Sequence, residues 1–451
     1  MSDLLLTYYG DDFTGSTDVM ESLTLGGVAT VLFLDAPTPE FLKTRFPEAR
    51  AVGVAGISRS MTPAQMDTDL PGQFAGLRQL NAPILHYKVC STFDSSPTIG
   101  SIGHAIDIAW DIFQPDTVPL VIGSHWLKRY VVFGNLFARV GDVTYRIDRH
   151  PTMSKHPVTP MHEGDLRLHL GKQTARKIGL IDVLALDNGE ADHQLKRLRD
   201  NGTEIVLFDT LELRHLDTIG RLLWEATSQG TPLIVGSSGV ENALTAHWQG
   251  QNIIHKAAAI TPPDPVKQMV VMSGSASPVT AGQIQWALDN GFTGIRLDSP
   301  SLVHPDSCDE AAHKAIEAAL TVIASGSSVV LYSALGPDDA AVIETKNALA
   351  SLGLETEKAG TILAKQQGRI LKSILEKSGL RRVCVAGGDT SGHTARQLGI
   401  YALTMRMPIA PGAPLCRAYS DDPTIDGIEI SLKGGQNGSV DYFGAIQRGH
   451  A

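Results

Sequence analysis

The chain has 451 residues, of which 43% are hydrophobic and 19% are charged. A chain of this size and composition can bury an ample core, which excludes global disorder, and at about 150 residues per domain it has room for two large domains or three smaller ones. The 38 basic and 48 acidic residues leave a net charge of −10. That balance argues against wholesale nucleic-acid binding, because phosphate neutralisation needs a basic face, but it allows a local basic pocket for a small anion.

The four cysteines, Cys90, Cys308, Cys384 and Cys416, lie far apart and form no C-x-x-C pair. This spacing argues against a zinc ribbon or a disulfide framework and favours a reducing compartment. The first residues lack the features of a signal peptide, and no stretch reaches the roughly 18 uninterrupted apolar residues of a membrane span. We therefore expect a cytoplasmic protein without a membrane partner; whether it forms a homodimer stays open.

Short apolar runs alternate with segments of helical period through most of the chain. In chain order, the runs predict strands over residues 4–9, 28–34, 51–57, 84–89, 119–122, 181–186, 204–208 and 233–235. Apolar residues at spacings of three and four over 102–113 predict one face of a helix. Near-continuous apolar strands separated by helices indicate an α/β fold with a mostly parallel sheet covered on both faces.

A proline-rich segment, residues 261–267, divides the chain. Its three prolines remove backbone donors and fix φ, so neither a helix nor an inner strand runs through it. The alternation then resumes, with strands expected over 269–272, 294–297, 329–332, 383–386 and 428–432, and helices up to 290 and over 309–324 and 440–447. We predict domains at 1–260 and 268–451 joined by this linker; the alternative is one large domain with a proline-rich surface loop.

Three glycine- or serine-rich junctions follow strands of the second predicted domain. They are residues 273–277, with Ser275 at the centre, residues 387–392, which include Gly387, Gly388, Asp389 and Thr390, and residues 434–438, which begin with Gly434 and Gly435. Such a junction exposes backbone N–H groups at a helix N-terminus, which attracts a phosphate, and glycine lets the backbone approach it. Helix capping alone is the alternative. Neither a Walker A motif nor a G-x-G-x-x-G fingerprint is present, which disfavours a P-loop ATPase and a simple dehydrogenase.

Acidic residues follow the first predicted strand. Asp11 and Asp12 stand at its end and Asp18 comes soon after. Adjacent carboxylates at a strand's carboxyl end can act as a general base, accept sugar hydroxyls or bind a metal. One of them could instead cap the following helix, with Thr14 or Ser16 as rival caps, but three aspartates are more than capping needs.

A second polar cluster follows the fourth predicted strand. It consists of Lys88, Ser91, Thr92 and Asp94. This set would suit a small polyol carrying a carboxylate, with Lys88 as the counter-charge; the alternative is a solvent-facing serine-rich turn. Arg59, after the third strand, is a further candidate anion clamp, although a surface arginine would look the same.

Four histidines, His150, His156, His162 and His169, match no compact metal-ligand spacing. A structural zinc site is therefore disfavoured, and a single histidine of this group that touches substrate is more plausible. No metal-binding residue is assigned.

Five ordered motifs resemble the four-carbon acid sugar kinases over nearly the whole chain. They are residues 10–15, 88–94, 156–161, 273–277 and 387–392. The resemblance implies an ATP-dependent kinase of the terminal hydroxyl of threonate, erythronate or 3-oxo-tetronate. It also implies an N-terminal sugar-acid domain, a C-terminal nucleotide domain and an active site in a cleft between them.

By this resemblance, Ser275, Gly387, Gly388, Asp389, Thr390, Gly434 and Gly435 would contact ATP, and Asp11, Asp12, Lys88, Ser91 and Asp94 would surround the sugar acid. Mg²⁺ would bridge the β and γ phosphates, and Asp12 would accept the proton of the attacking hydroxyl. Asp389 is a further candidate carboxylate on the metal side.

The sequence departs from the tetronate kinases after the fifth strand. Residues 123–129 contain Trp126, Lys128 and Arg129 where those kinases have an Asn-Gly-Arg turn. A branched or oxo acid such as 3-oxo-isoapionate is therefore a reasonable substrate. The alternatives are a regulator that binds nucleotide or sugar acid without turnover, and another sugar-acid enzyme on a doubly wound fold.

Overall fold

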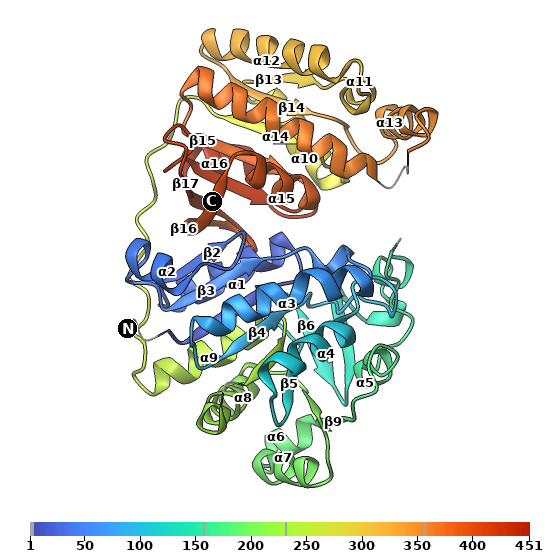
Figure 1. Ribbon diagram of the computed structural model, residues 1–451, viewed down its shortest axis with the longest axis vertical. Helices are drawn as coiled ribbons and strands as arrows, with labels where there is room; N and C mark the ends of the chain where they lie inside the picture. Colours follow the sequence, from blue (N-terminus) through green and yellow to red (C-terminus); the bar gives the residue numbers. More distant parts are fainter. Residues whose placement is uncertain (1–3, 157, 231, 355–357) are drawn as a thin grey trace. The chain divides into compact units, whose positions relative to one another are not determined.

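The structure is a computed structural model that describes residues 4–156, 158–230, 232–354 and 358–451. The chain divides into two compact units, Met1–Ala258 and Ala259–Ala451, each an α/β layer structure (Figure 1). Across the described residues, no helix is both long and apolar enough to cross a membrane.

The sheet of the N-terminal unit has the order β2-β3-β1-β4-β11-β5-β10-β9, with parallel pairing throughout. Its strands are β1 (Leu6–Gly10), β2 (Thr30–Phe33), β3 (Ala51–Ala55), β4 (Leu85–Lys88), β5 (Val118–Val121), β9 (Ile178–Ile181), β10 (Ile205–Phe208) and β11 (Leu233–Gly236). Most of these strands are buried along their whole length, as expected for a parallel sheet with helices on both faces.

The helices of this unit are α1 (Phe13–Leu25), α2 (Pro39–Arg45), α3 (Pro63–Gln79), α4 (Ile102–Phe113), α5 (Leu166–Leu170), α6 (Val183–Asp187), α7 (Ala191–Asp200), α8 (Leu213–Glu225) and α9 (Gly239–Gly250), with short 3-10 turns η1 (Ser58–Ser60), η2 (Ile147–Arg149), η3 (Met153–Lys155) and η4 (Ala226–Gln229). Helices α3 and α4 pack together on one face of the sheet, and α1, α8 and α9 pack on the other (Figure 1). Helix α3 begins with a capping box between Thr62 and Gln65 and a proline in its first turn, so its start is encoded locally.

The C-terminal unit has the strand order β13-β14-β12-β15-β18-β17-β16. Its strands are β12 (Val270–Ser273), β13 (Phe292–Arg296), β14 (Ser328–Tyr332), β15 (Arg382–Ala386), β16 (Ile400–Ala410), β17 (Ala413–Ser420) and β18 (Glu429–Lys433). The first five strands of that order are parallel, whereas β17 runs antiparallel to both β18 and β16.

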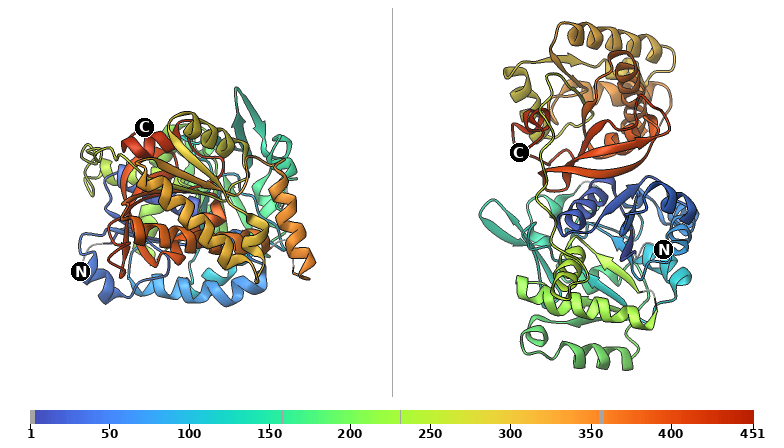
Figure 2. Two further views of the ribbon diagram at one scale, coloured as in Figure 1. Left: turned by 90° about the horizontal axis from the view of Figure 1, so that it is seen from above. Right: turned by 90° about the vertical axis from the view of Figure 1, so that its left-hand side faces the viewer.

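Helices cover both faces of this sheet as well (Figure 2). They are α10 (Pro278–Asp289), α11 (Ser299–Val303), α12 (Cys308–Ala324), α13 (Ala340–Ser351), α14 (Ala359–Ser378), α15 (Gly388–Gln397) and α16 (Tyr442–Arg448). Helix α14 packs between α12 and α15, and α10 packs against α16. The prediction of a two-domain, mostly parallel α/β protein is confirmed.

One predicted strand is wrong. Residues 181–186 were expected to be extended, but β9 ends at Ile181 and helix α6 begins at Val183. Asp182 is the N-cap, and its side chain accepts a hydrogen bond from the backbone N–H of Ala185. A short apolar run has no period that separates a strand from a buried helical turn, so the capping aspartate decides the outcome.

Two antiparallel elements were not predicted. Strands β6 (Arg129–Val132), β7 (Asn135–Val140) and β8 (Val143–Arg146) form a small separate sheet inserted after β5, and β16 with β17 forms a long hairpin at the edge of the C-terminal sheet. Strands β6 to β8 are mostly half-buried or exposed, and their patterns are weaker signals than the continuous apolar runs of the parallel strands. In β16 and β17 prolines, arginines and hydroxyl residues interrupt the apolar pattern.

Candidate active site

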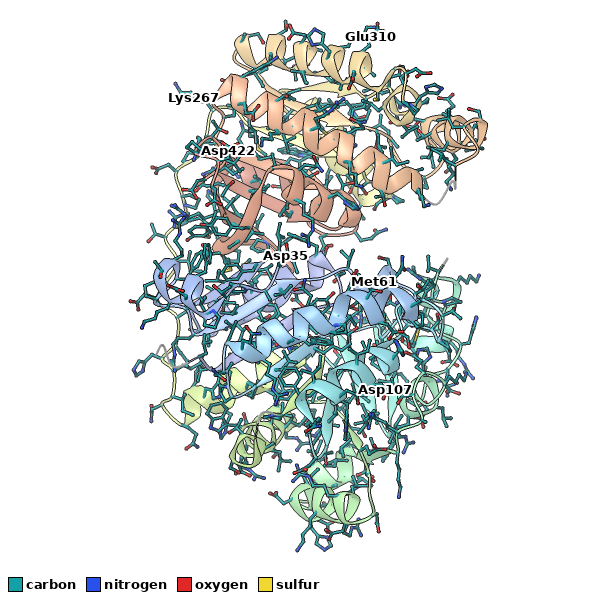
Figure 3. All side chains as sticks on the ribbon, viewed as in Figure 1. Asp35, Met61, Asp107, Lys267, Glu310 and Asp422 are labelled. Atoms are coloured by element: carbon teal, nitrogen blue, oxygen red, sulfur yellow. The ribbon has the colours of Figure 1, made fainter. Side chains whose placement is uncertain are left out.

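The N-terminal sheet reverses its winding direction at β1. The chain passes from β1 to β2 and β3 on one side and then crosses to β4 on the other side. In an open parallel sheet, loops that diverge in this way leave a crevice at the carboxyl ends of the strands. Asp11, Arg59 and Lys88 follow or end the strands beside this crevice, and Met61, labelled in Figure 3, marks the turn that carries Arg59.

Arg59 bridges the two adjacent aspartates. Its Nη2 lies 2.6 Å from Asp11 Oδ1 and 3.0 Å from Asp12 Oδ1, and its Nη1 lies 2.8 Å from Asp12 Oδ2. The Arg59 backbone N–H also donates to the Asp11 carbonyl at 2.9 Å. The predicted anion clamp is thus already engaged with two internal carboxylates, and its planar fork fixes their relative orientation.

The two aspartates differ in exposure. The side chain of Asp11 is 4% exposed and that of Asp12 is 28% exposed. Burial raises the pKa of Asp11 above its ordinary value, and the Arg59 guanidinium opposes that rise. Asp12 also caps α1, because its Oδ1 accepts from the Gly15 backbone N–H at 2.7 Å. Capping therefore accounts for one of its contacts, and the ion pair with Arg59 is a second.

Lys88 is buried beneath these carboxylates. Its Nζ lies 3.8 Å from Asp18 Oδ2, and only 3% of its side chain is exposed. Burial lowers the pKa of Lys88, but neighbouring carboxylates, Asp18 foremost, raise it more, so the ammonium stays protonated. A Cβ on Gly15 would lie 3.0 Å from this nitrogen and 2.4 Å from Asp12 Oδ1, which explains glycine at that position.

The loop after β4 forms a compact polar turn. Thr92 Oγ1 donates to Asp94 Oδ1 at 2.5 Å and lies 2.9 Å from Cys90 Sγ. Ser91 and Asp94 are also buried, so the alternative of a solvent-facing turn is wrong. Burial raises the pKa of Cys90 to about 11, which keeps it a thiol. Within the described residues, Asp94 forms no ion pair, and its Oδ1 accepts the hydrogen bond of Thr92.

The C-terminal sheet has its own reversal, at β12. Strands β13 and β14 lie on one side of β12 and β15 lies on the other, with β18 next to β15. The three glycine- or serine-rich junctions follow β12, β15 and β18, so parallel pairing brings them to one sheet edge.

The junctions contact one another closely. A Cβ on Gly435 would lie 2.6 Å from Ser275 Oγ, and one on Gly387 would lie 3.4 Å from the Ser275 backbone nitrogen. Gly387 has φ of +131°, a conformation that favours glycine. Gly434 links β18 to this contact and accepts a hydrogen bond from the Asn437 backbone N–H at 3.3 Å. Three loops far apart in sequence therefore form one backbone-lined surface.

Helix α15 begins at this surface. Gly387 is its cap, and nothing lies within 4 Å of the position that a Cβ on Gly388 would take. The early N–H groups of a helix have no intrahelical partner, and the helix dipole favours an anion there. Thr390 lies in this first turn; the side chain of Asp389 lies outside the part of the chain that the structure describes.

Family models match both units. The "Sugar-binding N-terminal domain" matches residues 6–244 and the "Nucleotide-binding C-terminal domain" matches residues 270–443. The chain is 48% identical over 448 residues to a "3-oxo-isoapionate kinase" of Paraburkholderia graminis, covering 99% of this chain and 94% of that protein. The chain belongs to the four-carbon acid sugar kinase family.

Further relatives agree with this placement. The kinase is 30% identical over 445 residues to a "3-oxo-tetronate kinase" of Cupriavidus necator, covering 97% of this chain and 95% of that protein. A solved structure from Haemophilus influenzae has a TM-score of 0.72 at 23% identity and covers 98% of this chain and 99% of that one, which supports the fold alone. The predictions of a sugar-acid kinase and of an alcohol as phosphoryl acceptor are confirmed, and the non-catalytic regulator is not favoured.

Several side chains of the kinase site were not predicted. Ser238, after β11, hydrogen-bonds Asp18, and its Oγ lies 3.4 Å from Ser124 Oγ after β5. These serines follow β11 and β5, which are neighbours in the sheet although they are distant in sequence. Their position at strand ends was the only signal in the sequence.

The third glycine junction of the kinase is held from below by α10. Thr280 Oγ1 donates to the Gly435 carbonyl at 2.8 Å, and Gln283 Nε2 donates to the Asn437 carbonyl at 2.9 Å. Lys433 is fully buried, and its Nζ donates to Thr280 Oγ1 at 3.1 Å. Burial lowers the pKa of Lys433 to about 8. A lysine that ends an apolar strand immediately before two glycines is a signal that sequence reasoning could have used.

Proposed function

We propose that this kinase transfers the γ-phosphoryl group of ATP to a terminal hydroxyl of 3-oxo-isoapionate or a closely related branched oxo acid. The observation that carries this proposal is the 48% identity to a "3-oxo-isoapionate kinase", against 30% to a "3-oxo-tetronate kinase" over a similar length. The bulky and basic residues after β5, Trp126 and Lys128, support a pocket that differs from that of the tetronate kinases.

In this proposal the polyol part of the substrate binds at the acidic edge of the N-terminal unit, which is the sheet edge that carries Asp11, Asp12 and Asp94. Asp94 offers a buried carboxylate without an ion pair among the described residues, and Ser91 and Thr92 add hydroxyl groups. Asp11 and Lys88 would act mainly through the network, since both are buried and face opposite charges. Arg59 would position the two aspartates.

Asp12 is the proposed general base. Its side chain is the more exposed of the two adjacent carboxylates, and Arg59 and the Gly15 N–H fix its orientation. A base within hydrogen-bond reach of the attacking hydroxyl would take its proton as the bond to phosphorus forms. Positioning of that hydroxyl would supply most of the remaining rate, because phosphoryl transfer depends on alignment and charge neutralisation.

The nucleotide would bind the edge of the C-terminal unit. Backbone N–H groups around Ser275, Gly387, Gly388, Asp389 and Thr390, together with the Gly434 and Gly435 turn, would hold the phosphates. The open space at Gly388 and the uncapped first turn of α15 fit an anion there.

Magnesium is part of the proposal, as in other phosphoryl transfers. Within the described part of the chain, no group of three His, Cys, Asp or Glu side chains could hold a metal ion. This fits an ion carried largely by the phosphates, since Mg²⁺ in kinases keeps several waters and takes few protein carboxylates. When bound, it would supply charge neutralisation at the β and γ phosphates.

We also propose a cytoplasmic location. All four cysteines are free thiols, which is the usual state in a reducing compartment.

The test is ADP release in a coupled assay with ATP, Mg²⁺ and a panel of four- and five-carbon sugar acids. We expect the branched oxo acid to give the highest kcat/KM.

Asp12→Asn should lower kcat by about 100-fold or more with unchanged ADP affinity, because a general base contributes about 10²–10⁴-fold. Asp111→Asn, at an exposed position of α4, is the matched control and should behave as wild type. Turnover of Asp12→Asn within a few-fold of wild type would remove Asp12 as the base.

A further inference from the structure

The two cations closest to the adjacent aspartates of the N-terminal unit, Arg59 and Lys88, both face internal carboxylates. Arg59 pairs with both Asp11 and Asp12, and Lys88 faces Asp18. Asp94 adds another carboxylate at the same edge. A sugar acid carries its own negative charge, so its carboxylate would be repelled here unless another cation receives it.

Arg129 lies at the same edge. It begins β6, and its backbone forms a two-way bridge with Ser124 after β5, at 3.0 Å in each direction. Ser124 Oγ in turn lies 3.4 Å from Ser238 Oγ, and Ser238 hydrogen-bonds Asp18. A short series of contacts through Ser124 and Ser238 therefore connects Arg129 to Asp18.

The guanidinium of Arg129 is incompletely satisfied. Its Nη1 donates to the backbone carbonyls of Leu127, Lys128 and Arg139 at 2.8, 3.3 and 3.5 Å. Its Nε is buried and has no hydrogen-bond partner among the described residues. Among the described residues no carboxylate lies within ion-pair distance of it, unlike Arg59 and the neighbouring Arg139 and Arg146. A buried charged donor without an acceptor is unfavourable, and an anionic oxygen of a ligand would satisfy it.

His150 supplies a second unpaired donor. It is 4% exposed, and its Nδ1 accepts from the backbone N–H groups of Thr152 and Met153 at 3.2 and 3.1 Å. These two bonds place the proton of the neutral ring on Nε2, which is buried and has no partner.

The small sheet connects Arg129 to His150 through Tyr145. Arg129 pairs with Ala138 and Ala138 with Tyr145 across β6, β7 and β8, so Arg129 and Tyr145 project to the same face of the small sheet. The Tyr145 ring lies edge-on to the His150 ring at 6.2 Å. Burial lowers the pKa of His150, and the positive charge of Arg129 contributes to this lowering.

We propose that Arg129 and His150 bind the carboxylate of the sugar acid. The proposal rests on the proposed sugar-acid kinase function and specifies its substrate contacts. One charged and one neutral N–H donor complement the two oxygens of a carboxylate, and neither donor has another acceptor. The polyol part of the substrate would then extend toward Asp94 and Asp12.

The experiment compares the best sugar acid of the panel with its carboxamide, which keeps every hydroxyl but removes the charge. For Arg129→Gln we expect KM for the acid to rise by about 10- to 100-fold, the range for loss of a charge-assisted hydrogen bond, with KM for ATP unchanged. The effect on the carboxamide should stay within a few-fold. Arg129→Lys should recover part of the loss, and His150→Gln should give a smaller rise of the same selectivity. Arg139→Gln, on the exposed part of the same small sheet, is the control.

Equal effects of Arg129→Gln on the acid and the carboxamide, or an unchanged KM for the acid in both Arg129→Gln and His150→Gln, would overturn the proposal. Calorimetric binding of the acid without ATP separates this failure from failure of the proposed function. Wild-type protein that binds the acid through Arg129 but releases no ADP would refute the kinase function and uphold the site. Wild-type protein that binds no sugar acid at all would refute the site.

Discussion

The buried Lys433, beneath the proposed nucleotide site, should destabilise the fold. Its ammonium has one hydrogen bond, to Thr280 Oγ1, and lies near the Tyr442 ring. Burial raises the pKa of the neighbouring Cys384 thiol to about 12, which keeps it neutral, and among the described side chains no carboxylate forms an ion pair with Lys433. Lys433→Met keeps the length of the side chain and removes the charge.

The free-energy cost of burying the charged Lys433 follows from the shift of its pKa. Burial lowers the pKa of Lys433 from 10.5 to about 8. Since a tenfold change in a protonation equilibrium is worth about 1.4 kcal/mol, keeping this lysine charged at pH 7 costs about 3 kcal/mol of folding free energy. We therefore expect Lys433→Met to raise the free energy of unfolding of the C-terminal unit by about 2 to 3 kcal/mol at pH 7, as for other buried charges replaced by apolar groups.

The sign of the pH dependence is determined by the same shift. Below about pH 8 the lysine is charged in both the folded and unfolded states and the penalty is fully present. Between about pH 8 and 10.5 the folded state loses its proton before the unfolded state does, so the wild-type protein gains stability relative to Lys433→Met. The advantage of the variant should therefore shrink as pH rises through this window.

The assay is denaturant unfolding at pH 7 and pH 9.5, following the transition that ADP shifts upward, since ligand binding identifies the unit that carries the site.

Lys433→Met should also raise KM for ATP by about tenfold through loss of a positive charge beneath the third junction, a change of about 1.4 kcal/mol. Lys346→Met, at an exposed position of α13, is the control. A less stable Lys433→Met protein at pH 7, or an advantage that does not change with pH, would refute this reasoning.

Two further predictions concern the loops. Gly435→Ala should raise KM for ATP by about tenfold or more, because its Cβ would lie 2.6 Å from Ser275 Oγ. Gly282→Ala is the control, because its Cβ would enter open space, and it should stabilise α10 by about 0.5–1 kcal/mol. ATP titration and thermal unfolding of the two variants measure these effects, and equal ATP affinities would contradict the prediction for Gly435. Arg59→Lys should lower kcat at least tenfold although the charge is kept, because an ammonium cannot form the hydrogen bonds that the guanidinium makes to both aspartates. A wild-type kcat in this variant would show that the guanidinium is dispensable.

Much of the fold was predictable because its determinants are local. Continuous apolar runs predicted the buried parallel strands, and 102–113 predicted α4 from its periodicity. The failure at 181–186 has a local cause too, a capping aspartate within a run too short to show a period. The inserted β6–β8 sheet is mostly half-buried or exposed, and polar residues interrupt the apolar pattern of the β16–β17 hairpin, so both carry weaker patterns.

The sequence by itself determined which residues stand at the carboxyl ends of the strands. It therefore determined which loops would form the carboxyl edge of each of the two sheets. Only the tertiary structure decided what those residues do there. Arg59, predicted as an anion clamp, contacts two internal aspartates, while Arg129 and His150 each keep a donor without a partner among the described residues. The physical reason is that charge pairing and burial depend on which strands become neighbours. That order is decided by crossover connections between segments far apart in the chain.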